Sequence, residues 1–256
     1  MQENVIHQTT VDARYYELDQ HGFVKPAALL NYLQSAAADH ALSLGIGVVD
    51  LLKTGRTWVL SRINLKMSHY PRVRDSITIR TWPVSRGTIF CIRDFELFDG
   101  AGVPCGAATT SWAVLDTTTR RPVKLDDVLP AYPLNGVRAI DDDFATLPEI
   151  ECDETLRLPV LRDNLDINRH VNNTVYAGWA LEAVPSAIAD ESTLISLEIG
   201  FRAEARYGDT ITSCCRPEPT EGDCFLHRIG TVSDGRELAR ARSRWAVSTE
   251  SRTGGR

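Results

Sequence analysis

The spacing of hydrophobic residues changes from helical to strand-like within the first half of the chain. Apolar residues recur every three or four positions between residues 26 and 44, which predicts a helix with Gly45 as its C-cap. Segments in which β-branched residues alternate with polar ones follow, and these predict strands. We expect the strands at residues 58–67, 75–83, 89–99 and 105–116.

The second half of the chain shows the same order of patterns. A helical pattern covers residues 172–189, and strand patterns follow at 194–204, 209–217, 223–233 and 237–248. The dipeptides Asp99-Gly100 and Asp234-Gly235 are hairpin signals at corresponding places. Each half is therefore expected to form one helix followed by antiparallel strands.

Short motifs also match between the halves, in the same order. Leu18, Asp19 and Val24 coincide with Leu165, Asp166 and Val171 at one constant offset, which also aligns Tyr32 with Trp179. Residues 75–79 match 209–212, and residues 112–114 match 245–247. The repeat length predicts a tandem duplication of a small domain rather than a solenoid. We expect an N-terminal domain at 1–125, a linker at 126–154 and a C-terminal domain at 155–256.

The duplication and the element order together predict a fold class. One helix cannot cover both faces of a sheet, so the economical solution wraps each sheet around its own helix and pairs two such units. The expected fold is α+β: a tandem (double) hotdog, with two antiparallel sheets each wrapped around a long helix. The linker contains four prolines between residues 120 and 154 and an acidic run at 141–143, as expected of a surface connector.

Composition excludes several classes of protein. The 256 residues are 43% hydrophobic and carry a net charge of −6, which argues against disorder and against general binding of nucleic acid. No apolar run reaches the length of a membrane span, and the N-terminus lacks a signal-peptide pattern, so we expect a cytoplasmic protein. The six cysteines form no CxxC motif or zinc-finger spacing, and we expect neither metal nor cofactor. Since no secretory signal is seen, the thiols are expected to be reduced and mostly buried.

A polar cluster distinguishes the second copy from the first. Asp166, Asn168 and His170 precede the second helix, whereas the first copy has Asp19, His21 and Phe23 at these places. Glu204 aligns with Tyr70, so the second copy also gains a carboxylate. An imidazole and a carboxylate can activate water, and an amide can donate to an oxyanion.

The same residues permit a purely structural interpretation. Asp166 and Asn168 would then cap a turn, and Asn172 or Asn173 would be the N-cap of the following helix. His170 would be an exposed loop residue. The absence of the Asn and the His from the first copy favours the catalytic interpretation.

Over residues 8–249 the chain resembles the acyl-acyl carrier protein thioesterases of bacteria and plants. The resemblance rests on residues 30–34, 39–41, 58–62, 70–71 and 81–82 in the first copy, and on 165–185 and 201–205 in the second. It implies hydrolysis of a fatty acyl thioester, with Asp166, Asn168, His170 and Glu204 as catalytic residues. Plant members often have Cys after the catalytic Glu; here that residue is Ala205, so activated water or a carboxylate must attack.

The resemblance also implies binding sites. The acyl tail is expected in the first copy, and Asn172 and Asn173 are expected beside the reacting group. Plain core packing is the alternative for the tail-lining residues. An acidic acyl carrier protein would need a basic surface, from Arg120, Arg121 and Lys124 or from Arg202 and Arg206. The candidate tail-lining residues are Leu29, Leu33, Ala36, Ala37, Trp58 and Ile63.

Three alternative functions remain open at this point. The first is an acyl-CoA thioesterase of the same fold, and the second is a non-catalytic acyl-ligand sensor or carrier. The intact polar cluster argues against the second, since a binder needs only an apolar tunnel. A dehydratase of the same fold is the third, and the DxNxHVNN context disfavours it. The duplication makes a monomer plausible, and a homodimer is also compatible with the sequence.

Overall fold

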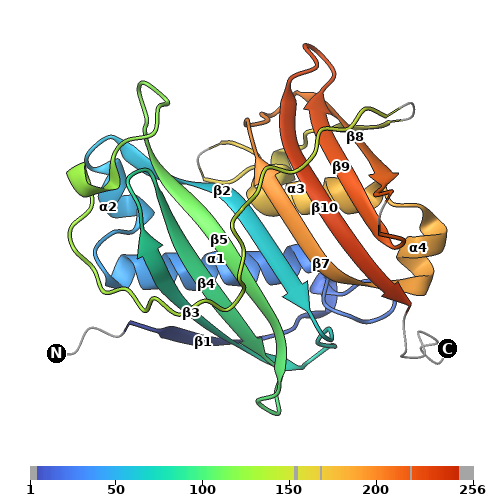
Figure 1. The fold of residues 1–256 in the computed structure, drawn as a ribbon, viewed down its shortest axis with the longest axis horizontal. Coiled ribbons are helices and arrows are strands. Elements are labelled where there is room, and N and C mark those ends of the chain that lie inside the picture. The colour runs from blue at the N-terminus through green and yellow to red at the C-terminus, as the bar shows by residue number, and fades with distance from the viewer. Residues whose placement is uncertain (1–4, 153–154, 168, 220, 248–256) are drawn as a thin grey trace. The chain divides into compact units, whose positions relative to one another are not determined.

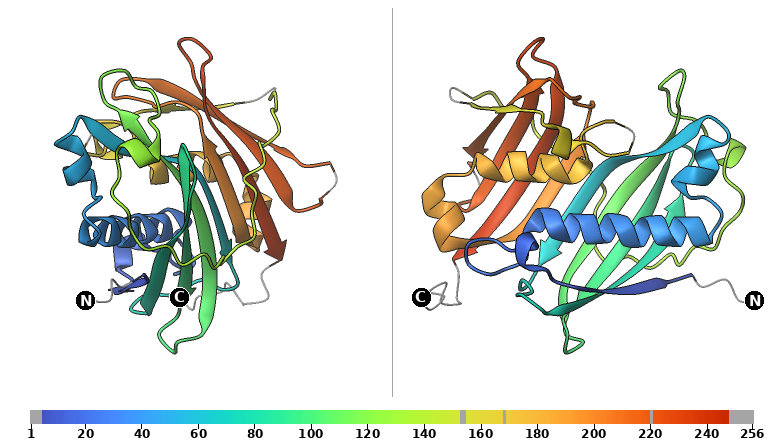
Figure 2. Two further views of the ribbon diagram at one scale, coloured as in Figure 1. Left: turned by 60° about the vertical axis from the view of Figure 1, so that its left-hand side comes forward. Right: turned by 180° about the vertical axis from the view of Figure 1, so that it is seen from behind.

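The computed structural model describes residues 5–152, 155–167, 169–219 and 221–247. The chain divides into two compact units, Met1–Asp143 and Phe144–Arg256, here called the N-terminal and C-terminal units. In each unit a helix packs on an antiparallel sheet (Figure 1, Figure 2). No helix in these described ranges is long and apolar enough to cross a membrane.

The N-terminal unit places its long helix α1 (Pro26–Ser43) against the sheet. Pro26 occupies the first helical turn, and Gly45 follows the helix in the left-handed conformation with φ of 71°. Helix α2 (Val48–Leu52) packs on β2. The described strands, in antiparallel order across the sheet, are β1 (His7–Asp12), β3 (Ser76–Arg86), β4 (Phe90–Phe98), β5 (Pro104–Asp116) and β2 (Arg56–Met67).

The C-terminal unit repeats this arrangement with a shorter helix. Helix α3 (Asn173–Glu182) packs on β8, β9 and β10, and α4 (Ser186–Glu191) follows it. The single helix expected over 172–189 is therefore wrong, because Pro185 lacks the N–H that would continue α3. The described strands are ordered β7 (Ser192–Phe201), β10 (Glu237–Val247), β9 (Cys224–Thr231), β8 (Thr210–Pro217) and β6 (Leu156–Pro159).

Equivalent backbone contacts occur in the two units. An isolated bridge joins Leu18 to Val24, and an equivalent one joins Leu165 to Val171. Each copy then bridges to the segment that follows its first long strand. These contacts align the two Asp loops at the offset found in the sequence, and they align Glu204 with Tyr70. The equivalent pairs are Phe23–Arg72 with His170–Arg206, and Val24 N to Pro71 O with Val171 N to Ala205 O.

The segment between the copies is anchored to both units rather than simply crossing the surface. In the N-terminal unit the indole Nε1 of Trp82 donates to Val137 O at 2.8 Å. The buried carboxylate of Asp94, on β4, accepts hydrogen bonds from Arg138 Nε and Ala139 N. In the C-terminal unit Arg240, on β10, donates to Leu147 O at 2.9 Å. Outside the short 3-10 turn at Leu125–Asp127, the described part of this segment forms no regular element.

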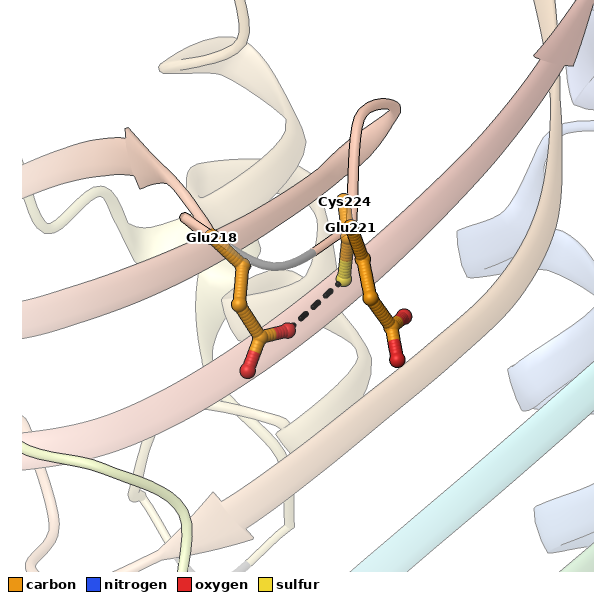
Figure 3. Close-up of side chains that lie close together, drawn as sticks. All are labelled: Glu218, Glu221 and Cys224. Atoms are coloured by element: carbon orange, nitrogen blue, oxygen red, sulfur yellow. Dashed lines mark hydrogen bonds between the residues drawn. The ribbon is translucent and has the colours of Figure 1, made fainter.

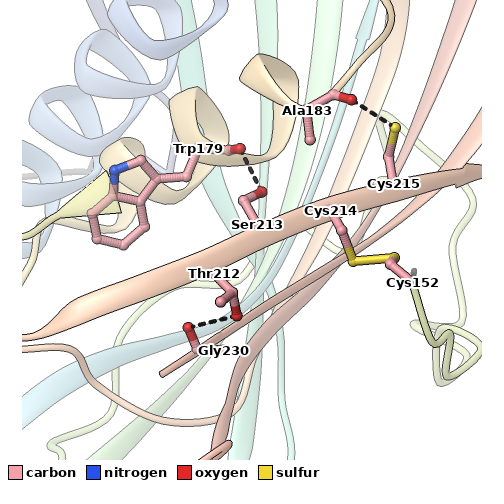
Figure 4. The surroundings of a disulfide bond; sticks show 8 residues. All are labelled: Cys152, Trp179, Ala183, Thr212, Ser213, Cys214, Cys215 and Gly230. Carbon is pink, nitrogen blue, oxygen red and sulfur yellow. Dashed lines mark hydrogen bonds between the residues drawn. A yellow bond between two sulfur atoms is a disulfide. The ribbon is translucent and has the colours of Figure 1, made fainter. Parts of the chain in front are cut away.

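The cysteines depart in part from the sequence expectation of reduced thiols. Cys152 and Cys214 form a disulfide with a Cα–Cα distance of 6.2 Å, which joins the connecting segment to β8 (Figure 4). Their separation of 62 residues in sequence gives no sign of this proximity. The other four cysteines are free thiols. Cys91, Cys105 and Cys224 are buried, and Cys215 is half-buried.

A buried histidine in the C-terminal unit should make stability depend on pH. His227 lies on β9 with Nε2 2.8 Å from Ser243 Oγ, and burial lowers its pKa to about 4. Between pH 6.5 and 4 the unfolded chain binds a proton that the folded chain excludes, so stability falls as the pH falls. At pH 5 this contribution amounts to about 2 kcal/mol relative to pH 7.5.

Urea unfolding at pH 5 and pH 7.5 tests this expectation. His227→Gln removes the titrating group, so the difference in unfolding free energy between the two pH values should shrink by about 2 kcal/mol. An unchanged difference in the variant would show that His227 does not titrate as described.

Candidate active site

An imidazole and a carboxylate meet in the C-terminal unit. His170 lies in the loop before α3, and Glu204 lies three residues beyond the end of β7. The distance between His170 Nε2 and Glu204 Oε2 is 3.3 Å. Their side chains are 22% and 33% exposed, so both remain accessible to water or a small group. The expectation that Glu204 lies on the strand is wrong, but its proximity to His170 suits acid–base chemistry.

Asp166 shapes the loop that carries His170. Its Oδ1 accepts a hydrogen bond from the His170 backbone N at 3.2 Å, and its own N donates to His170 O at 2.8 Å. Arg169 adopts the left-handed conformation with φ of 64°, where the first copy has Gly22 at φ of 83°. Asp166 therefore holds the backbone of His170. Asn168 lies outside the described residues.

Asn172 is the N-cap of α3, as the structural interpretation expected. Its Oδ1 accepts a hydrogen bond from Thr174 N at 3.2 Å, and its carbonyl accepts one from Val175 N at 3.0 Å. These two helix-start amides are therefore already engaged. Neither offers a ready hydrogen bond to a developing oxyanion. Asn173, the first residue of α3, is half-buried.

The corresponding place in the N-terminal unit has kept the loop but not the reactive groups. Asp19 Oδ1 accepts hydrogen bonds from His21 N and Phe23 N, at 2.8 and 3.0 Å. Phe23 stands where the second copy has His170, and Tyr70 stands where it has Glu204. The same backbone frame thus presents an imidazole and a carboxylate in one copy only.

The expected acyl-tail residues lie in the interior of the N-terminal unit, apart from one. Leu29, Leu33, Ala36 and Ala37 form part of the buried face of α1, and Ile63 is buried on β2. Trp58 is half-buried near α2, where its Nε1 donates to Ile46 O at 2.7 Å. These positions are compatible with core packing as well as with a tail-binding surface.

The free thiols are poorly suited to act as nucleophiles. Burial raises the pKa of Cys91, Cys105 and Cys215 to about 11, and burial with the neighbouring Glu218 raises that of Cys224 to about 12. Cys215 Sγ donates to Ala183 O at 2.9 Å (Figure 4). Little thiolate exists at neutral pH under these conditions.

Among the described residues, one cluster of side chains is of the types that bind metal ions. Glu218, Glu221 and Cys224 lie together, and Cys224 Sγ donates to Glu218 Oε2 at 3.1 Å (Figure 3). Both carboxylates are already paired with arginines, Glu218 with Arg242 and Glu221 with Arg244. The cluster is thus charge-compensated by protein groups.

Tyr176 is a site residue that motif spacing does not single out. Its hydroxyl oxygen accepts a hydrogen bond at 2.9 Å from the backbone N of Ala205, the residue that follows Glu204. The signal lies in the repeat alignment, since Tyr176 falls on Leu29 of the first copy at the same offset that aligns Asp19 with Asp166.

Two family models cover most of the chain. The model of the acyl-ACP thioesterase N-terminal domain matches residues 4–132, and that of the C-terminal domain matches residues 148–247. Among curated proteins, the chain is 29% identical to oleoyl-acyl carrier protein thioesterase 1 of Arabidopsis thaliana, a chloroplast protein, over 91% of this chain and 74% of the relative. It is 24% identical to a chloroplastic acyl-[acyl-carrier-protein] hydrolase of Cuphea viscosissima, over 96% of this chain and 64% of the relative.

Solved structures show the same fold. An acyl-ACP thioesterase from Bacteroides thetaiotaomicron superimposes with a TM-score of 0.82 at 23% identity, covering 96% of this chain and all of that one. The 12:0-ACP thioesterase from Umbellularia californica gives a TM-score of 0.81 at 23% identity, covering 96% and 98%. With both domain models matched in order and a shared fold, the chain belongs to the acyl-ACP thioesterase family, whose reaction is hydrolysis of the fatty acyl thioester of acyl carrier protein.

Proposed function

We propose that the C-terminal unit carries the reaction and that His170 and Glu204 activate its water. The observation that supports this most directly is the 3.3 Å contact between the two side chains, at a place where the first copy has Phe23 and Tyr70. An imidazole paired with a carboxylate can accept a proton near neutral pH. The geometry is compatible with either group contacting the water directly.

The proposed reaction has two steps. Water attacks the thioester carbonyl carbon while one of its protons passes to the His170–Glu204 pair. The addition converts the carbonyl into a tetrahedral oxyanion. The C–S bond then breaks, the carbonyl re-forms, and the proton passes to the leaving thiolate. The products are a fatty acid and the carrier's free thiol. We assign Asn168 to the oxyanion and Asp166 to holding the His170 loop; the two backbone hydrogen bonds between Asp166 and His170 support the second role.

We further propose a division of labour along the chain. The N-terminal domain, residues 1–125, would hold the acyl tail on the surface lined by Leu29, Leu33, Ala36, Ala37, Trp58 and Ile63. The C-terminal domain, residues 155–256, would hold the reacting group, with Asn172 and Asn173 beside it, and residues 126–154 would link the two. In this arrangement each domain is a hotdog unit, and its sheet wraps around its own helix.

The carrier would meet the chain beside His170. Acyl carrier protein is acidic, and Arg206 is exposed while its backbone bridges that of His170. Arg202 instead pairs with Glu237 at 3.3 Å, which makes it the weaker candidate of the two. A cytoplasmic location remains our prediction; the plant relatives are named as chloroplast proteins.

Release of free thiol from matched acyl-carrier-protein and acyl-CoA substrates of several chain lengths tests the proposal. We expect rapid release from the carrier protein, lost in His170→Ala. Faster release from acyl-CoA would indicate the alternative carrier. Acyl binding without release from either substrate would contradict the catalytic role and support an acyl-ligand sensor.

A further inference from the structure

We propose that Tyr176 is a positioning residue that holds Glu204 against His170 through the peptide of Ala205. The inference rests on the proposed function, because it concerns the geometry of the same pair. Tyr176 touches neither the water nor the thioester in this proposal; it acts on the backbone next to the carboxylate.

Ala205 is the point at which the two halves of the pair are tied together. The residue is fully buried, and its N–H donates to the Tyr176 hydroxyl at 2.9 Å. Its carbonyl accepts a hydrogen bond from Val171 N at 3.2 Å. Val171 directly follows His170, and Ala205 directly follows Glu204. One residue, Ala205, therefore links helix α3, the His170 loop and the Glu204 segment through its N–H and its carbonyl.

The Tyr176 side chain is itself held rigidly. Its ring contacts Trp179 and Phe201 edge-on, with centroids 5.0 and 5.6 Å away. Burial, and less strongly the charge of Glu204, raise the pKa of Tyr176 to about 12, so the phenol keeps its proton at neutral pH. A hydroxyl oxygen on a packed aromatic ring is a fixed acceptor for the Ala205 N–H.

The first copy shows the same frame without this hydrogen bond. Leu29 replaces Tyr176, and Pro71 replaces Ala205, so both the acceptor and the donor are missing. The other bond is kept, since Val24 N donates to Pro71 O at 2.8 Å. The frame thus folds without the tyrosine. The tyrosine and its N–H partner occur together in the copy that has the carboxylate and the imidazole.

A second contact near Glu204 is also present in the second copy and missing from the first. Arg236 Nη2 lies 3.4 Å from Glu204 O, and Arg236 follows the Asp234-Gly235 hairpin turn. At the corresponding hairpin of the first copy, Ala101 occupies this place and cannot make the contact. The Glu204–Ala205 peptide is therefore contacted by both Tyr176 and Arg236, and the first copy has neither side chain at the equivalent positions.

The decisive experiment compares kcat and KM for acyl-carrier-protein hydrolysis in Tyr176→Phe, Ala205→Pro and the double variant. Phenylalanine keeps the ring contacts and removes the acceptor. Proline removes the donor, as Pro71 does in the first copy, and it also fixes the backbone φ at this position. We expect each single variant to lower kcat about tenfold with KM within about twofold. Because both single variants break the same hydrogen bond, the double variant should be no slower than either of them.

Tyr32→Phe is the matched control. Its hydroxyl donates to Glu17 Oε2 at 2.5 Å in the N-terminal unit, so the variant also removes a phenol hydrogen bond at a helix. We expect it to change the melting temperature but not kcat. If the Ala205→Pro chain does not fold, Tyr176→Phe alone decides through the separate changes in kcat and KM.

Two results would overturn the proposal. Tyr176→Phe with a lower melting temperature and a wild-type kcat would mean that the hydroxyl serves folding only. A double variant about a hundredfold slower would mean that the two residues act independently. Failure of the proposed function looks different, since His170→Ala would then retain full activity. If His170→Ala is inactive and Tyr176→Phe is not, only the role of Tyr176 is disproved.

Discussion

Replacing His170 with alanine is expected to lower kcat by at least about 100-fold, the usual scale for a group that transfers protons. Glu204→Gln should do the same, because an amide can neither accept the proton nor stabilise an imidazolium 3.3 Å away. Since the two groups act together, the double variant should be little slower than either single variant. The measurement is steady-state hydrolysis of an acyl-carrier-protein substrate, with folding checked by circular dichroism.

The N-terminal unit offers a matched control for this experiment. His69 Nε2 lies 3.2 Å from Asp99 Oδ2, with side chains 38% and 25% exposed, so it is a histidine–carboxylate pair of similar geometry. His69→Ala should leave kcat unchanged. Near-normal turnover in both His170→Ala and Glu204→Gln would contradict the assignment of this pair as the base.

The largest stability effect is expected at Asp94. Its carboxylate is fully buried and accepts hydrogen bonds from Thr109 Oγ1, Arg138 Nε and Ala139 N, at 2.5, 3.1 and 2.7 Å. Asp94→Ala removes the acceptor of the buried Thr109 hydroxyl, of the half-buried Ala139 N–H and of the Nε–H of the partly buried Arg138 guanidinium. Removing one partner of such a buried pair costs about 3–5 kcal/mol. Urea unfolding of the variant should show a loss of this size.

The neighbouring position on the same strand supplies the comparison. Glu96 pairs with Arg80 at 3.1 Å, but their side chains are 38% and 37% exposed. A surface pair of this kind contributes under about 1 kcal/mol, so Glu96→Ala should be nearly neutral. If Asp94→Ala lost as little unfolding free energy as Glu96→Ala, the connecting segment would contribute little to the stability of the N-terminal unit.

Much of the fold could be predicted because its signals are local. The helix at 26–44 and the hairpin dipeptides depend on residue spacing and turn chemistry, and the observed α1 and strands agree with them closely. The repeat alignment also predicted that Glu204 corresponds to Tyr70. The duplication itself made this comparison informative, since a difference between equivalent residues indicates a difference in role.

Features that depend on distant contacts could not be predicted. The Cys152–Cys214 disulfide and the anchoring of residues 137–139 on Trp82 and Asp94 join segments that are far apart in sequence. Asn172 carried two interpretations, and only the bond from Thr174 N identified it as an N-cap. Tyr176 lay within a helical pattern in which aromatic residues are usually core residues.

The preserved Asp loop in both copies has a consequence for how such a site can change over time. In an assembly of identical subunits, a substitution at a position such as residue 23 appears in every subunit at once. Here the two loops share the same backbone bonds but are encoded separately, so Phe23 and Tyr70 could replace reactive groups in one copy while His170 and Glu204 stayed in the other. Fusion of the copies thus lets selection act on each loop alone, and one half can specialise without loss of the reaction.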